Sequence, residues 1–195
     1  MKLDNYLSRL AKEVLFNTPG GLTKVRFAKI LYFVHKGLVN KNLSSFDDLK
    51  FIRMPLGPVP VGFKDLVEDE DIQVTDVKKT PLSYDMQLYM LIRSGHYLND
   101  NASEVVRSVV DNLKQLPTSY LVEEAHKDPS WINHVNGDEY FIGQDDLNLG
   151  LPSGRANTPQ DPSEDAFRLQ AKLVEGMLDE IVEENTSLEY PENHK

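Results

Sequence analysis

Three prolines within six residues limit what the middle of this chain can form. The segment Pro55-Leu56-Gly57-Pro58-Val59-Pro60 fits neither a helix interior nor a central strand, because proline lacks the amide hydrogen that both require. Pro58 or Pro60 can open a helix at its first turn, and apolar spacing predicts a short helix over 61–68. We therefore expect a turn here, between a short strand over 50–54 and that helix.

Apolar residues recur at helical spacing on both sides of this turn. They predict helices over residues 2–16, 23–39, 102–115 and 118–126. Residues 72–77 alternate weakly, and 84–93 alternate better, with Met86, Leu88 and Met90 on one face of an extended chain. These two segments and 50–54 suit a small antiparallel sheet of two or three strands. The pattern predicts a compact, mainly α-helical domain with a small β element.

The C-terminal part has a different character. Residues 1–150 are expected to form the domain, and 151–163, rich in Pro, Gly and Ser, a linker or exposed loop. An amphipathic helix is predicted over 164–184, followed by a polar tail over 185–195. Such a helix can close over its own domain, dimerise or dock on a partner, and packing on its own domain is the default.

Composition excludes several function classes. The chain has no cysteine, which rules out disulfide scaffolds, thiolate metal sites and cysteine nucleophiles. It has no apolar run of roughly 18 residues, so we expect no membrane span. Its five histidines form no helical metal pair, and glycine patterns for phosphate binding are missing. We expect a cytoplasmic protein that is not an enzyme and uses no metal or cofactor.

Charge divides the chain unevenly. Residues 1–64 carry 11 Lys and Arg against 4 Asp and Glu, whereas residues 65–195 carry 10 against 27. The acidic second part argues against general nucleic-acid binding, while the basic first third can contact phosphate or an acidic protein. The plainer interpretation is that lysines such as Lys24, Lys29 and Lys36 solvate helix faces. A helix-turn-helix around Pro19 is an alternative, although large apolar residues in 23–39 are more typical of a core.

Three motifs in order give a more specific signal. Residues 22–33 read LTKVRFAKILYF, Gly57-Pro58-Val59 follows 24 residues after Phe33, and residues 124–131 read EAHKDPSW. Together they resemble the Panacea domain, the SocA-like antitoxin family, over about residues 5–135. That family has a T-x-x-x-x-x-K-L-L-Y-F helix, a G-P-V turn, and a helix ending in T-H before a tryptophan. Here Ile30 replaces a leucine and Ala125 replaces the threonine.

The resemblance implies a mostly helical domain that neutralises a cognate protein toxin by direct binding. It does not identify the toxin. One branch of the family is similar to a proteolytic adaptor, and other relatives belong to prophages and mobile elements. A DNA-binding repressor is the competing class, and homo-oligomers are compatible with either. The motif residues implied as partner-binding or structural are Lys29, Tyr32, Gly57, Pro58, Val59, His126 and Trp131.

Elementary chemistry connects these motif residues. If Lys29 faces inward, its amine needs an acceptor, such as a carbonyl near Gly57 and Pro58. Gly57 suits a positive φ or a close backbone approach, and His126 and Trp131 can pack over the turn. The plainer interpretation, that these residues only hold the fold together, is at least as well supported as direct toxin contact.

Overall fold

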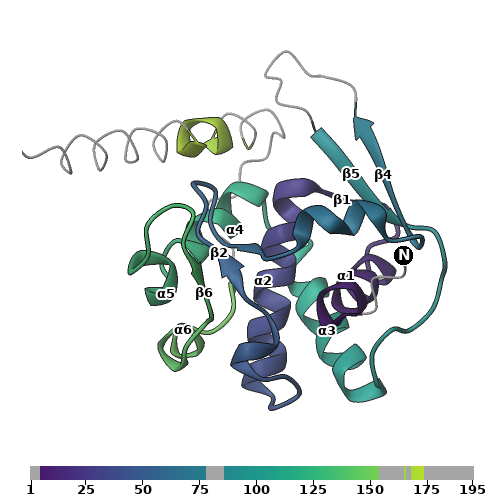
Figure 1. The fold of residues 1–195 in the computed structure, drawn as a ribbon, viewed down its shortest axis with the longest axis horizontal. Coiled ribbons are helices and arrows are strands. Elements are labelled where there is room, and N and C mark those ends of the chain that lie inside the picture. The colour runs from purple at the N-terminus through teal and green to yellow at the C-terminus, as the bar shows by residue number, and fades with distance from the viewer. Residues whose placement is uncertain (1–4, 78–85, 154–164, 166–167, 174–195) are drawn as a thin grey trace, which may run out of the picture.

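Helix α2 (Lys24–Asn40) is the element around which the others are arranged (Figure 1). The structure is a computed structural model that describes residues 5–77, 86–153, 165 and 168–173. Its remaining helices, of which η1 and η2 are 3-10 helices, are α1 (Tyr6–Phe16), η1 (Phe46–Asp48), η2 (Phe63–Glu68), α3 (Asp100–Leu113), α4 (Thr118–Ala125), α5 (Pro129–Ile132) and α6 (Gln144–Asn148).

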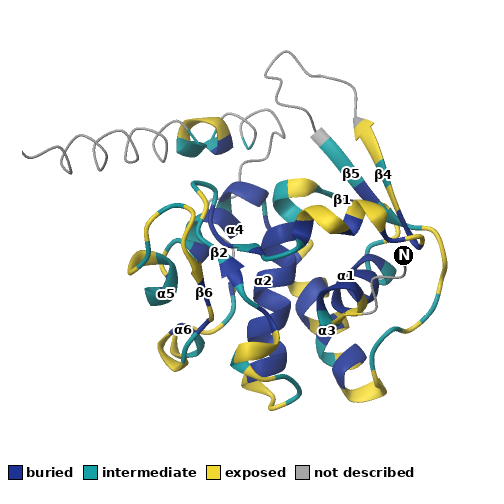
Figure 2. Ribbon diagram, viewed as in Figure 1, coloured by how far each residue is buried: buried dark blue, intermediate teal, exposed yellow. Residues whose placement is uncertain are grey.

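Other elements of the fold cover α2 on all sides. Every residue from 27 to 39 is buried, and α1, α3, α4, α6 and both sheets pack against the helix (Figure 2). Lys24 is exposed, as expected for a solvated helix face. Lys29 and Lys36 are only 1% and 2% exposed, so the expectation that they solvate the helix is wrong. A helix buried all round is normally apolar all round, so these two amines require partners inside the protein.

Two small antiparallel sheets replace the single sheet predicted. One has the order β1-β5-β4, from Leu22–Thr23, Met86–Leu91 and Ile72–Val77. The other has the order β3-β2-β6, from Val59–Pro60, Phe51–Ile52 and Glu139–Tyr140. The fold is therefore mixed α/β, with about half of it helical, and the mainly α prediction is corrected. Four of the strands have two residues, too few to leave a detectable alternation in the sequence.

Strand β5 turns a tyrosine toward the core. Tyr89 is 1% exposed, and its ring lies 5.4 Å from that of Phe27 and 5.5 Å from that of Phe63. Leu88 and Met90, which share the other face of the strand, are half-buried. Large aromatic rings bury more area than these aliphatic chains, and the strand is oriented so that Tyr89 meets the rings of α2 and η2.

Several predicted elements are confirmed. The strand over 72–77 has the predicted bounds, and α1, α2, α3 and α4 lie where the apolar spacing places helices. The region 129–148, to which the sequence-based analysis assigned no helix or strand, contains α5, β6 and α6. Asp146 holds this region together, because its carboxylate accepts hydrogen bonds from the amides of Ser130 at 2.9 Å and Gly143 at 2.6 Å.

The described end of the chain packs on the domain. Asp165 accepts hydrogen bonds from the amides of Thr118 and Ser119, at 3.3 and 2.9 Å, and so caps α4 from a distant segment. Residues 168–173 are helical, and Leu169 is buried. Most of the helix predicted over 164–184, the tail 185–195 and most of the linker 151–163 lie outside the described residues. Of the linker, Leu151 packs against the core.

Arg26 joins α2 to the end of α3. Its guanidinium donates hydrogen bonds to the carbonyls of Leu116 at 2.7 Å, Lys114 at 2.9 Å and Leu113 at 3.1 Å. The carbonyls of Leu113 and Lys114 lie at the end of α3, where a helix leaves carbonyls without intrahelical partners, and that of Leu116 lies in the connection to α4. A single side chain therefore terminates α3 and fixes it to the central helix.

We expect Arg26→Met to lower the free energy of unfolding by about 1–3 kcal/mol, because it keeps the apolar stem and leaves these carbonyls without their donor. Arg107→Met, on the exposed face of α3, is the matched control and should change stability by no more than about 0.5 kcal/mol. Urea denaturation of both variants measures the difference. Equal stabilities would show that Arg26 does not anchor α3.

Candidate functional site

The proline-rich turn supplies the acceptor for a buried lysine. Lys29, near the middle of α2, donates a hydrogen bond to the carbonyl oxygen of Pro58. No carboxylate in the described part of the chain forms an ion pair with it, and burial lowers the pKa of Lys29 well below its ordinary value. The contact with a carbonyl of this turn agrees with the sequence-based expectation.

Gly57 makes this close approach feasible. Its φ is +85°, in the left-handed region that favours glycine, and it is buried. A Cβ at this position would lie 3.1 Å from Lys29 Nζ and 3.4 Å from His126 Cδ2. The turn thus brings its backbone against α2 and α4 at a point where any side chain would press on both.

A stack of three side chains continues from the turn. The rings of His126 and Trp131 are parallel within 15° at a centroid distance of 4.0 Å, and the Arg53 guanidinium carbon lies 4.1 Å from the Trp131 ring centroid. Trp131 also donates to the carbonyl of Met54 at 3.3 Å. Burial, with the nearby Lys29 charge, lowers the pKa of His126 to about 3. The stack attaches α5 to β2 and to the proline-rich turn.

A buried ion pair lies two residues beyond His126. Asp128 accepts hydrogen bonds from Lys36 Nζ, at 2.9 and 2.8 Å to its two oxygens, and from the Tyr32 hydroxyl at 2.6 Å. Both charged side chains are only 2% exposed. Burial raises the pKa of Asp128, although Lys36 and Tyr32 act in the opposite direction. This pair fixes the α4–α5 junction to α2.

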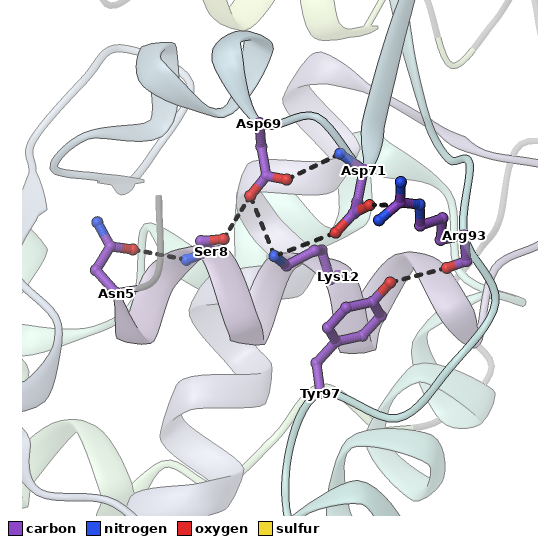
Figure 3. Close-up of polar contacts among 7 residues, drawn as sticks. All are labelled: Asn5, Ser8, Lys12, Asp69, Asp71, Arg93 and Tyr97. Atoms are coloured by element: carbon purple, nitrogen blue, oxygen red, sulfur yellow. Dashed lines mark hydrogen bonds and ion pairs between the residues drawn. The ribbon is translucent and has the colours of Figure 1, made fainter. Parts of the chain in front are cut away.

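A second polar cluster, around Lys12 of α1, is separate from these motifs (Figure 3). Lys12 Nζ lies 3.3 Å from Asp69 and 3.7 Å from Asp71, and Asp69 accepts a 2.5 Å hydrogen bond from the Ser8 hydroxyl. Asp71 also faces the Arg93 guanidinium at 3.4 Å. The cluster joins α1 to the chain entering β4. Nothing in the sequence-based analysis identified it.

The structure brings most of the predicted motif residues together. Lys29, Gly57, Pro58, His126 and Trp131 form one group, which we call the turn cluster. Val59 follows it in β3. Tyr32 points to Asp128 instead of the turn. Sequence reasoning missed three participants. Lys36 lies in an apolar helix, and a lysine there needs an anion, so this pair with Asp128 could have been sought from the sequence. Arg53 left no such signal.

The turn cluster is built as a structural joint. Lys29 is almost completely buried, while Trp131 remains partly accessible. Among the described residues, no group of three or more His, Asp or Glu side chains is placed to hold a metal ion. No helix in this described part is long and apolar enough to cross a bilayer. The buried members of the turn cluster therefore hold segments of the chain together, and a partner can reach only side chains at its edge, such as Trp131.

Comparison with known proteins identifies one related family. Residues 27–132, more than half of the chain, match the family model described as "Antitoxin SocA-like, Panacea domain". The match begins within α2 and ends with α5, so it includes the whole turn cluster and the Lys36–Asp128 pair. No curated protein and no solved structure matches the chain.

We expect Gly57→Ala to destabilise the protein more than Gly137→Ala. Both residues have positive φ, so both variants carry the conformational cost of about 1–2 kcal/mol. At Gly137, however, an added Cβ meets nothing within 4 Å, whereas at Gly57 it presses on Lys29. The excess cost of Gly57→Ala should be about 1 kcal/mol or more. Chemical denaturation measures it, and equal losses would show that the Lys29 contact is loose.

Protonation of His126 should weaken the fold. Its folded pKa of about 3 lies below the ordinary value of 6.5, so the unfolded chain takes up the proton first as pH falls. The stability conferred by neutral His126 is therefore complete above about pH 6.5 and declines as pH falls toward 3. We expect the difference in free energy of unfolding between wild type and His126→Gln to become smaller when the pH is lowered from 7 to 5, because only the wild type loses this contribution. An NMR titration in which folded His126 changes near pH 6.5 would contradict this.

Proposed function

Because this chain belongs to the SocA-like antitoxin family, which carries the Panacea domain, we propose that it is a non-catalytic antitoxin that neutralises a cognate protein toxin by binding it directly. The family match over residues 27–132 is the observation that carries this proposal. We place the protein in the cytoplasm and expect it to need no cofactor or metal. A homo-oligomeric antitoxin is compatible with this role.

The geometry supports an indirect role for most motif residues. Lys29, Tyr32 and Gly57 are buried, so a toxin cannot reach them without unfolding the domain. They hold the proline-rich turn and the α4–α5 junction against α2, and so position the accessible side chains next to them. Toxin contact then falls to exposed neighbours of the turn cluster, such as Met54, whose side chain is 42% exposed.

The repressor alternative loses its main support. A helix-turn-helix protein reads DNA with an accessible face of its second helix. Here that helix would be α2, and every residue from 27 to 39 is buried. The basic residues in the first third are in part used internally, since Arg26 caps α3 and Lys36 pairs with Asp128. This arrangement favours a protein partner over a DNA groove.

The decisive experiment uses the neighbouring reading frame. Expressed alone it should arrest growth, and co-expression with this chain should restore growth and yield a complex that survives size-exclusion chromatography. A copy of this chain with an early stop codon controls for the added transcript and should give no rescue. A harmless neighbour that does not co-purify would contradict the proposal, and salt-dependent binding to the chain's own promoter would then be measured.

A further inference from the structure

An apolar groove lies beside the turn cluster. Its cavity of about 170 Å³ is lined by side chains from the start of α2, the proline-rich turn, β3 and η2. Val25, Leu56 and Val59 are half-buried members of this lining, and the exposed Met54 lies at its edge. A cavity of roughly 150 Å³ accepts a benzene-sized group. The groove therefore has room for one large apolar side chain.

The accessible charge of the groove is positive. Lys24 and Lys29 line it, and no Asp or Glu belongs to its described lining. Lys29 is buried and donates to Pro58, so the exposed Lys24 is the charge that a partner can reach. The groove is thus complementary to an apolar group that carries negative charge beside it.

A helical segment of this chain already reaches the groove. Leu173, at the end of the described helical residues 168–173, forms part of the groove lining. The same segment is held on the domain by Asp165, which caps α4, and by the Lys172–Glu123 ion pair at 3.5 Å. A helical segment can therefore present a leucine to the groove. Helices with an apolar face commonly bind grooves of this kind.

We propose that this groove, which we call the Lys24 groove, is the docking site for an acidic amphipathic helix of the protein partner. One large apolar side chain of that helix fills the cavity, and a neighbouring carboxylate pairs with Lys24. This inference rests on the proposed antitoxin function and adds the surface and the chemistry of the partner. The buried Lys29 donates to Pro58 and so fixes the turn that forms one wall of the groove.

The test compares two groove variants with a control of the same kind. Leu56→Glu places a carboxylate on the groove wall, and Lys24→Glu reverses the exposed charge. Val67→Glu adds the same charge in η2, at a side chain 50% exposed that does not line the groove. Lys24→Arg keeps the charge. All four are checked by circular dichroism and thermal unfolding before the dissociation constant for the toxin identified by co-expression is measured by calorimetry.

We expect Leu56→Glu to weaken toxin binding by about tenfold or more, because it opposes both the apolar contact and the partner's charge. Lys24→Glu should weaken it by about threefold or more and reduce its dependence on salt. Lys24→Arg and Val67→Glu should bind like wild type. Folded groove variants that bind the toxin as tightly as wild type would overturn the proposal.

The other occupants of the groove give different results. Unchanged toxin binding with a lower melting temperature would assign the groove to this chain's own C-terminal segment. Unchanged toxin binding with an altered oligomeric state, measured by light scattering, would assign it to a second copy. Both results overturn the docking proposal while the antitoxin function stands. Failure of the wild-type chain to rescue growth would instead overturn the antitoxin function, and the groove proposal with it.

Discussion

A lysine can be buried in a protein only when its amine keeps hydrogen-bond partners, and α2 buries two lysines. Lys29 uses a backbone carbonyl of the proline-rich turn, and Lys36 uses the carboxylate of Asp128. Each bond reaches a different segment, so the burial of α2 depends on where those segments lie. Removing one partner from a buried ion pair costs about 3–5 kcal/mol, a large part of the roughly 5–15 kcal/mol that stabilises a domain.

Polar side chains that bond to distant segments also connect the other elements of the fold. Arg26 holds the end of α3, Asp165 caps α4, and Lys12 joins α1 to the segment that enters β4. Each of these contacts joins two different elements and fixes their relative position, which apolar packing alone does not specify. Accessible surface remains beside the turn cluster, at Met54 and along the Lys24 groove. A rigid frame next to an accessible apolar surface suits a binding protein, since little ordering is required on association.

Features of the fold that depend on residues close together in the chain could be predicted from the sequence, whereas those that depend on distant residues could not. The long helices and the strand over 72–77 were predicted because their apolar period is local. The elements over 129–148 were not, because each is only two to five residues long and the start of the region is held by Asp128, whose donors come from α2. In the site, the positive φ of Gly57 and the acceptor carbonyl of the proline-rich turn followed from proline and glycine chemistry. The partner of Lys36 did not, because a single aspartate in a turn resembles any solvated residue.

The distance along the chain between Lys36 and Asp128 has a consequence for synthesis. The two residues are 92 positions apart, and a ribosome that adds roughly 5–20 residues per second needs on the order of 5–20 s to cover that interval. Tyr140, which closes the β3-β2-β6 sheet against Phe51, emerges later still. During this time α2 has been made, but the carboxylate that pairs with Lys36 has not. A nascent chain of this protein therefore carries a central helix with an unpaired lysine until about two thirds of its length has been translated.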